Sequence, residues 1–242
     1  MKIRSVVVAL AIILGAPSSQ PQQQYLYKAS LVQAAPGKLL DLIHAYKDLW
    51  AAESRVAGEE APLWMRHSQG DRWDLLILYP MGSYSDYYRS ERVAAREKAV
   101  EPWRAMVQTA IAWQEDVFAY GPPLDEVRKA FSGAGFFHVE MFQVLPGRQA
   151  ALYQEGEMEN AYARALKEPE NLIFVRDQGA AWDLFTVGCF RDLKHYAESA
   201  NVSPQDQEAA AKAAGFASPS QVGPYLRIFI ALHHDTLAVA VK

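Results

Sequence analysis

The chain has 242 residues, of which 50% are hydrophobic and 21% are charged, so it holds enough apolar material for a globular core. Its formal net charge is −4 and its Lys and Arg residues form no cluster, which excludes nucleic acid and anionic membrane surfaces as expected partners. One cysteine, Cys189, excludes an internal disulfide, so core packing must hold the fold.

The first residues have the pattern of an export signal. Lys2 and Arg4 form a basic start, residues 6–14 are an almost unbroken apolar run, and residues 15–19 are small. The run is too short to span a bilayer comfortably. We expect a signal peptide over residues 1–19, no integral membrane segment after its cleavage, and a periplasmic or secreted protein. The alternative is an uncleaved anchor.

A first module is predicted over residues 20–120. Apolar side chains recur at three- and four-residue steps from Leu39 to Trp50, which predicts an amphipathic helix that starts at Pro36 and ends near Gly58. Pro102 divides a later helical region into more than one piece. The remaining elements expected here are strands at 25–33, 63–67, 73–79 and 111–120 and the helical region at 83–107.

A linker over residues 121–133, with a short helix at 124–131, precedes a second module over residues 134–242. This module has a longer final connection, the insertion at 199–224, which contains an Ala-rich helix at 205–214. The other elements expected here are strands at 136–144, 172–178, 182–190 and 230–241, a helix at 148–166 and a helical start at 193.

The two modules share three landmarks in the same order. Gln-Gly-x-x-Trp-Asp-Leu occurs at 69–75 and again at 178–184, a Pro-Gly pair opens each first helix, and a short apolar strand ending in Gln precedes each pair. Each module therefore reads as one β-α-β-β-α-β unit, duplicated in tandem, and the fold class is α+β. Such a unit leaves one sheet face apolar, and two copies can cover each other.

On this element order, duplication and pair of Trp-Asp-Leu hairpins, the chain resembles the dimeric α+β barrel superfamily in a tandem-duplicated, single-chain form. The resemblance covers about residues 25–241. It implies two ferredoxin-like modules packed sheet to sheet as an intramolecular barrel, a monomer with an internal pseudo-dimer, and pockets between sheet and helices. Members include cofactor-independent monooxygenases of quinols, haem-degrading and haem-binding enzymes, isomerases and small-molecule binders, so fold alone does not decide the activity.

The strongest candidate for chemistry is a polar group in the second module. His138 and Glu140 alternate on one strand and share a face, and they are the catalytic candidates. His233 and His234 lie on the last strand, which neighbours the first, so one of them could converge with the pair. A His can serve as a base or haem ligand, and the set could bind a divalent metal, but the spacing is no recognised ligand motif and no metal site is assigned. The alternative is a solvated pair near a sheet edge.

Three further residues are candidates for ligand binding. Arg176, matched by Arg66, could clamp a carboxylate or phenolate, or else bond an acid such as Asp183. Trp182 and Tyr196 are large aromatics that either line a pocket or pack the core. The first module carries Lys28, Ser30, Trp113 and Gln114 at the positions matched to the polar group, so any such chemistry belongs to the second module. Glu155 and Glu159, four apart on a helix, are expected on a solvated face.

The sequence thus predicts an exported protein that binds a small apolar or aromatic molecule between sheet and helices of the second module, with the insertion as a lid. Whether it is an enzyme stays open. The first alternative is a non-catalytic periplasmic interaction module. The second is a haem- or metal-binding protein of the same superfamily; the cofactor is unknown, with none as the first expectation.

Overall fold

The computed structural model describes residues 25–241, so the expected signal peptide lies outside the described residues. The strands are β1 (Tyr25–Ala34), β2 (Leu63–Gln69), β3 (Leu75–Gly82), β4 (Ile111–Gly121), β5 (Phe136–Val144), β6 (Leu172–Gly179), β7 (Leu184–Phe190) and β8 (Ile230–Ala240). The α-helices are α1 (Leu39–Ala57), α2 (Tyr84–Tyr87), α3 (Ser90–Val100), α4 (Arg104–Ala110), α5 (Leu124–Ser132), α6 (Gln149–Ala165), α7 (Leu193–Tyr196), α8 (Pro204–Ala214) and α9 (Val222–Arg227), and the 3-10 helices are η1 (Ala197–Asn201) and η2 (Pro219–Gln221). Within residues 25–241, no helix combines the length and apolar character needed to cross a membrane.

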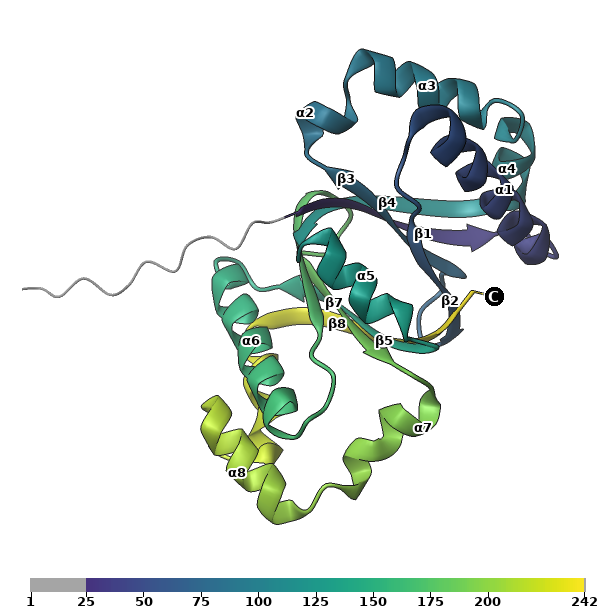
Figure 1. The fold of residues 1–242 in the computed structure, drawn as a ribbon. Helices are drawn as coiled ribbons and strands as arrows, with labels where there is room; N and C mark the ends of the chain where they lie inside the picture. The colour runs from purple at the N-terminus through teal and green to yellow at the C-terminus, as the bar shows by residue number, and fades with distance from the viewer. Residues whose placement is uncertain (1–24, 242) are drawn as a thin grey trace, which may run out of the picture.

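The strands form one closed antiparallel barrel in the order β1-β3-β2-β8-β5-β7-β6-β4 (Figure 1). Residues 25–121, the first half, supply the run β4-β1-β3-β2, and residues 136–240, the second half, supply β8-β5-β7-β6, which is the same order. Two seams join the halves, one between β2 and β8 and one between β4 and β6. The mixed α+β class is as expected, and closure leaves neither half with an open sheet edge.

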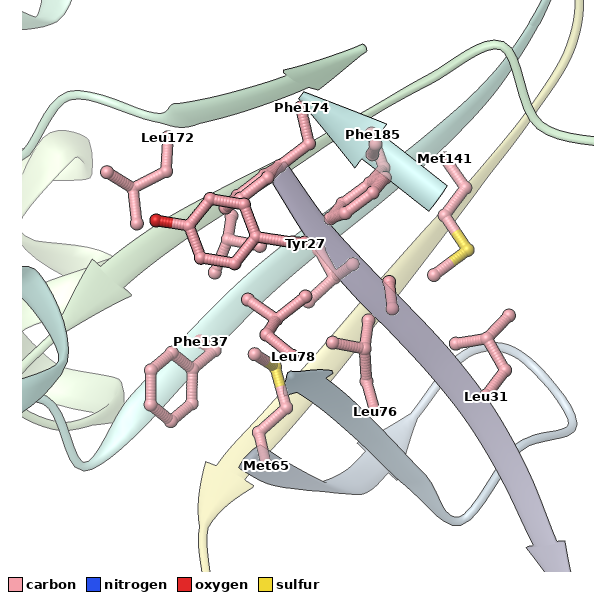
Figure 2. Close-up of a cluster of buried hydrophobic side chains, with 14 of the residues drawn as sticks. Tyr27, Leu31, Met65, Leu76, Leu78, Phe137, Met141, Leu172, Phe174 and Phe185 are labelled. Carbon is pink, nitrogen blue, oxygen red and sulfur yellow. The ribbon is translucent and has the colours of Figure 1, made fainter. Parts of the chain in front are cut away.

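The barrel interior is filled by apolar side chains from both halves (Figure 2). Tyr27 of β1 meets the Phe174 ring edge-on at 5.3 Å, and Phe174 stacks on Phe185 at 4.6 Å between centroids. All three are almost fully buried. The contact of Tyr27 with Phe174 joins the two halves, so interior packing and the two seams hold the barrel together.

Helices cover the outer face of the barrel (Figure 1). In the first half, α1 packs Leu42, Tyr46 and Trp50 on the outward side chains of β1 and β3. In the second half, α6 and α9 pack on β5 and β7, and α8 lies against α6. The expected linker helix is present as α5, and its Val127 is fully buried against the interior cluster.

The repeated Gln-Gly turn lies at the seams. Gly70, at φ +117°, passes against the backbone of β8, and Gly179, at φ +84°, passes against the backbone of β4. A Cβ on Gly179 would lie 2.5 Å from the Asp116 carbonyl oxygen. Glycine is required at these turns because the two halves approach each other too closely for a side chain.

Candidate functional site

His138 and Glu140 point away from the barrel interior, toward the helices. They alternate on β5 with Phe137 and Val139, which are buried in the interior cluster. In the sheet register Glu140 lies opposite Asp235 of β8 on one side and Thr186 of β7 on the other. Side-chain alternation along three neighbouring strands therefore gathers polar groups on one outer patch.

Asp235 connects the two histidines of this patch. Its Oδ1 lies 3.3 Å from His138 Nε2, and its Oδ2 lies 2.8 Å from His233 Nε2. The Glu140 carboxylate accepts a hydrogen bond of 3.4 Å from the Thr186 hydroxyl. One ligand atom from each of His138, Glu140 and Asp235 lies within 4.8 Å of the other two. The predicted convergence is present, and His233 is the β8 histidine that takes part.

Two carboxyl groups of α6 complete the set. The expectation that Glu155 and Glu159 lie on a solvated face is wrong: Glu155 is 2% exposed and Glu159 is half-buried. Glu155 follows Leu152 by three residues, so it shares the helix face that packs on the sheet. We call the six residues of this patch the polar cluster: His138, Glu140, Glu155, Glu159, His233 and Asp235.

Burial and mutual contact shift the pKa values of the polar cluster. Burial raises the pKa values of Glu140, Glu155 and Glu159, because each carboxylate would lose hydration when charged. The hydrogen bond from His138 lowers the pKa of Asp235. Burial opposes the charged form of His138, but the bond to Asp235 and the charge of Glu140 outweigh it and raise the pKa of this imidazole.

Tyr196 joins the polar cluster to a cavity. Its ring lies 5.5 Å from the His138 ring and also packs on Phe136 and Phe190. On another side Tyr196 lines a cavity of about 450 Å³, whose wall also includes Phe190, Val202 and the connection after α6. The start of the predicted insertion lines this cavity, whereas α8 packs on α6.

Three predicted site residues lie elsewhere. His234 faces the opposite side of β8, where its Nδ1 lies 3.1 Å from an Asp71 carboxylate oxygen and its ring packs on Trp182. The Trp182 indole N–H donates to Glu115 at 3.3 Å. Arg176 pairs with Asp183, the structural role weighed for it from sequence. Strand alternation turns His234 away from His233. All three residues therefore stabilise the β6–β7 turn and one end of the barrel rather than the polar patch.

Asp183 and its counterpart have matching roles in the two halves. Asp183 accepts a hydrogen bond of 2.8 Å from the Val144 amide, and Asp74 accepts one of 2.8 Å from the Ala34 amide. The repeated Trp-Asp-Leu sequence thus fixes the end of the first strand in each half to the neighbouring hairpin.

The first half keeps part of the polar pattern. Ser30 lies opposite Asp116 as Glu140 lies opposite Asp235, so the register matches Asp116 to Asp235. The same register matches Gln114 to His233, whereas the sequence comparison places Trp113 and Gln114 at the positions of His233 and His234. Lys28, in the place of His138, lies 3.8 Å from Asp116, and Ser30 donates to Asp116 at 2.5 Å. The expectation that the first half lacks the whole set therefore needs correction, since it keeps the aspartate with a basic partner.

Sequence reasoning also missed a cavity in the first half. It measures about 350 Å³ and lies between the sheet and helices α1 and α3, lined among others by Lys28, Glu53, Tyr79 and Arg96. Burial, followed by the charge of Glu59, raises the pKa of Glu53 to about 7. Glu53 follows Leu49 and Trp50 by four and three residues, so helical periodicity places it on the sheet-facing side of α1, and an acid at such a position is the signal that could have identified it.

Solved structures share this fold over most of the chain. An anthrone oxidase-like protein matches with a TM-score of 0.55 and 12% identity, covering 92% of this chain and 93% of that one. A proposed monooxygenase from Fusobacterium nucleatum matches with a TM-score of 0.54 and 11% identity, covering 90% and 93%. A variant chlorite dismutase from Candidatus Nitrospira defluvii matches with a TM-score of 0.50 and 9% identity, covering 90% and 92%.

No family model and no curated protein matches the sequence. The expected resemblance to the dimeric α+β barrel superfamily is confirmed as a likeness of fold. At these identities the likeness says nothing of the reaction or ligand.

Proposed function

We propose that this protein binds a small apolar or aromatic molecule between the sheet and helices of the second half. The observation that carries the proposal is Tyr196, whose ring forms a wall of the 450 Å³ cavity and also packs on His138. A ligand in this cavity meets the aromatic surfaces of Phe190 and Tyr196, and displacement of the Tyr196 ring brings it to the His138–Asp235 pair. The cavity wall combines these aromatic rings with polar side chains such as Lys167 and His195, and a hollow with apolar surfaces and a few convergent polar groups is the usual composition of a small-molecule site.

Binding of a protein partner alone is the weaker alternative. His138 and Glu140 are half-buried and converge on the more exposed Asp235, and such a convergence of ionisable groups is an unusual arrangement for a surface whose only task is docking. Haem is a further alternative, supported by His138, which packs on the cavity-lining ring of Tyr196. The names of the structural neighbours include oxidase-like, monooxygenase and chlorite dismutase, and we propose catalysis of an oxidative kind as the extension to be tested after binding.

Export, tandem duplication and a monomeric state remain part of the proposal. The basic start and apolar run of residues 1–19 support export to the periplasm or outside the cell. The shared strand order and paired Trp-Asp-Leu hairpins support descent of both halves from one unit, with the division at residues 20–120, 121–133 and 134–242.

The test begins with native mass spectrometry of protein purified without denaturation, followed by thermal denaturation against the retained ligand or a panel of one- and two-ring phenols and aromatic carboxylates. His138→Ala and Tyr196→Ala should abolish ligand-dependent stabilisation. Lys28→Ala, at the position of the first half that matches His138, is the control and should keep it. Unchanged stabilisation in the two second-half variants contradicts the proposal, and a Soret band in protein from haem-supplied cells supports the haem alternative instead.

A further inference from the structure

The polar cluster holds more acidic than basic groups. Its four carboxyl groups are those of Glu140, Glu155, Glu159 and Asp235, and the basic groups that pair with Asp235 are the imidazoles of His138 and His233. Glu155 is 2% exposed, and its Oε1 is buried without a hydrogen-bond partner among residues 25–241. A buried carboxyl oxygen without a partner is costly, and Glu155, whose carboxyl group also interacts with Glu159, adds this cost beside His138, Glu140 and Asp235.

The first half shows what balances the equivalent place there. The Lys28 ammonium stands where His138 stands and supplies a fixed positive charge beside Asp116. Counting from the Pro-Gly pair, Ala45 and Leu49 of α1 occupy the helix positions of Glu155 and Glu159. The second half thus loses a lysine and gains three buried or half-buried acids, the third being Glu140 in place of Ser30.

The donor atoms of His138 and Asp235 have a spacing suited to a single ion, and the Glu140 carboxylate lies beside them. His138 Nε2 and Asp235 Oδ1 lie 3.3 Å apart, and the set of three, with Glu140, lies within 4.8 Å. Two ligands of one ion, each at about 2.1 Å and a tetrahedral angle, are about 3.4 Å apart. We propose that His138, Glu140 and Asp235 bind one divalent transition-metal ion, which takes the place of the lysine charge of the first half.

The mixed donor set decides the class of ion. An imidazole with carboxylates suits Zn²⁺, Mn²⁺ or Fe²⁺, whereas Mg²⁺ and Ca²⁺ prefer oxygen alone. His233 holds the second oxygen of Asp235 at 2.8 Å and acts as a positioning residue, and Glu155 lies beside the three ligands on α6. This inference rests on the proposed function because both place His138 in the site. Binding of the ion, however, requires no organic ligand and can be measured separately.

The experiment titrates the full-length protein, after treatment with EDTA, with Zn²⁺ alone in a calorimeter, and with Co²⁺ alone in a spectrophotometer. We expect one equivalent of Zn²⁺, a visible Co²⁺ band and no comparable heat with Ca²⁺. His138→Ala and Glu140→Gln should weaken Zn²⁺ binding at least about 100-fold. His233→Ala should weaken it about tenfold, the range typical of residues that orient a ligand.

His44→Ala removes an exposed histidine of α1 and is the control for adventitious Zn²⁺ binding, which it should leave unchanged. Absence of Zn²⁺ binding by the parent protein, or full binding by both His138→Ala and Glu140→Gln, overturns the proposal. Glu140→Gln keeps the size of the side chain, so its Zn²⁺ binding tests the proposal if His138→Ala does not fold. Ligand-dependent stabilisation of EDTA-treated protein that binds no Zn²⁺ would retain the proposed function and refute the ion site; Zn²⁺ binding without such stabilisation would do the reverse.

Discussion

Replacement of Glu53 by Gln should change how the stability of the protein depends on pH. Glu53 lies on α1 against the first-half cavity, where burial and the charge of Glu59 raise its pKa from 4.5 to about 7, while Arg96 and Lys28 oppose the rise. The folded protein therefore holds this proton more tightly than the unfolded chain. The contribution is fully present below pH 4.5, declines as pH rises and is lost above about pH 7.

The shift corresponds to at most about 3.4 kcal/mol, at about 1.4 kcal/mol per pH unit. Because Glu53 is only half-buried, solvent screening reduces this to about 1–2 kcal/mol. Glu53→Gln cannot ionise, so it should match the parent protein near pH 4 and exceed its free energy of unfolding by about 1–2 kcal/mol at pH 8. The assay is urea denaturation followed by tryptophan fluorescence at several pH values. Glu91→Gln, an exposed position of α3, is the control and should show no such trend. A difference between Glu53→Gln and the parent protein that is constant with pH refutes the reasoning.

Two further predictions concern the barrel itself. Phe174→Ala removes a fully buried ring that stacks on Phe185, so it should lower the free energy of unfolding by about 3–5 kcal/mol in urea denaturation; a loss below about 1 kcal/mol would contradict the packing described. Gly179→Ala meets both a positive φ and a strand carbonyl 2.5 Å away, whereas Gly147→Ala has a similar φ of +75° and open space. The Gly147 variant should cost about 1 kcal/mol and the Gly179 variant at least about 3 kcal/mol in the same assay, and equal losses would show that the seam tolerates a side chain.

Much of the candidate site follows from strand periodicity. Alternation along β5 predicts that His138 and Glu140 share a face, and the strand order of the module brings β8 beside them. The same rule does not tell which of His233 and His234 takes part, because a shift of one residue in the register reverses the answer. The structure assigns His233 to the polar cluster and turns His234 toward Asp71, in a part of the chain 163 positions away.

The helix residues of the site could not be predicted in this way. The spacing of Glu155 and Glu159 is equally consistent with a solvated face, and only the docking of α6 on the sheet buries them. A comparison of the halves contained a signal, since Ala45 and Leu49 mark these positions as facing inward in the first half. In the first-half cavity Glu53 carries a similar signal, since it follows Leu49 and Trp50 by four and three residues on the face of α1 that packs on the sheet.

The sequence by itself determined the order of strands and helices, the resemblance between the halves and the hairpins at their repeated Gln-Gly turns, because turn chemistry and apolar periodicity act over a few residues. Tertiary structure alone decided how the halves meet. Closure of the barrel sets Gly70 against β8 and Gly179 against β4, and it places Asp71 beside residues of the last strand. Such contacts depend on the joint burial of two sheet faces and on the pairing of four otherwise open strand edges, which no short stretch of sequence encodes.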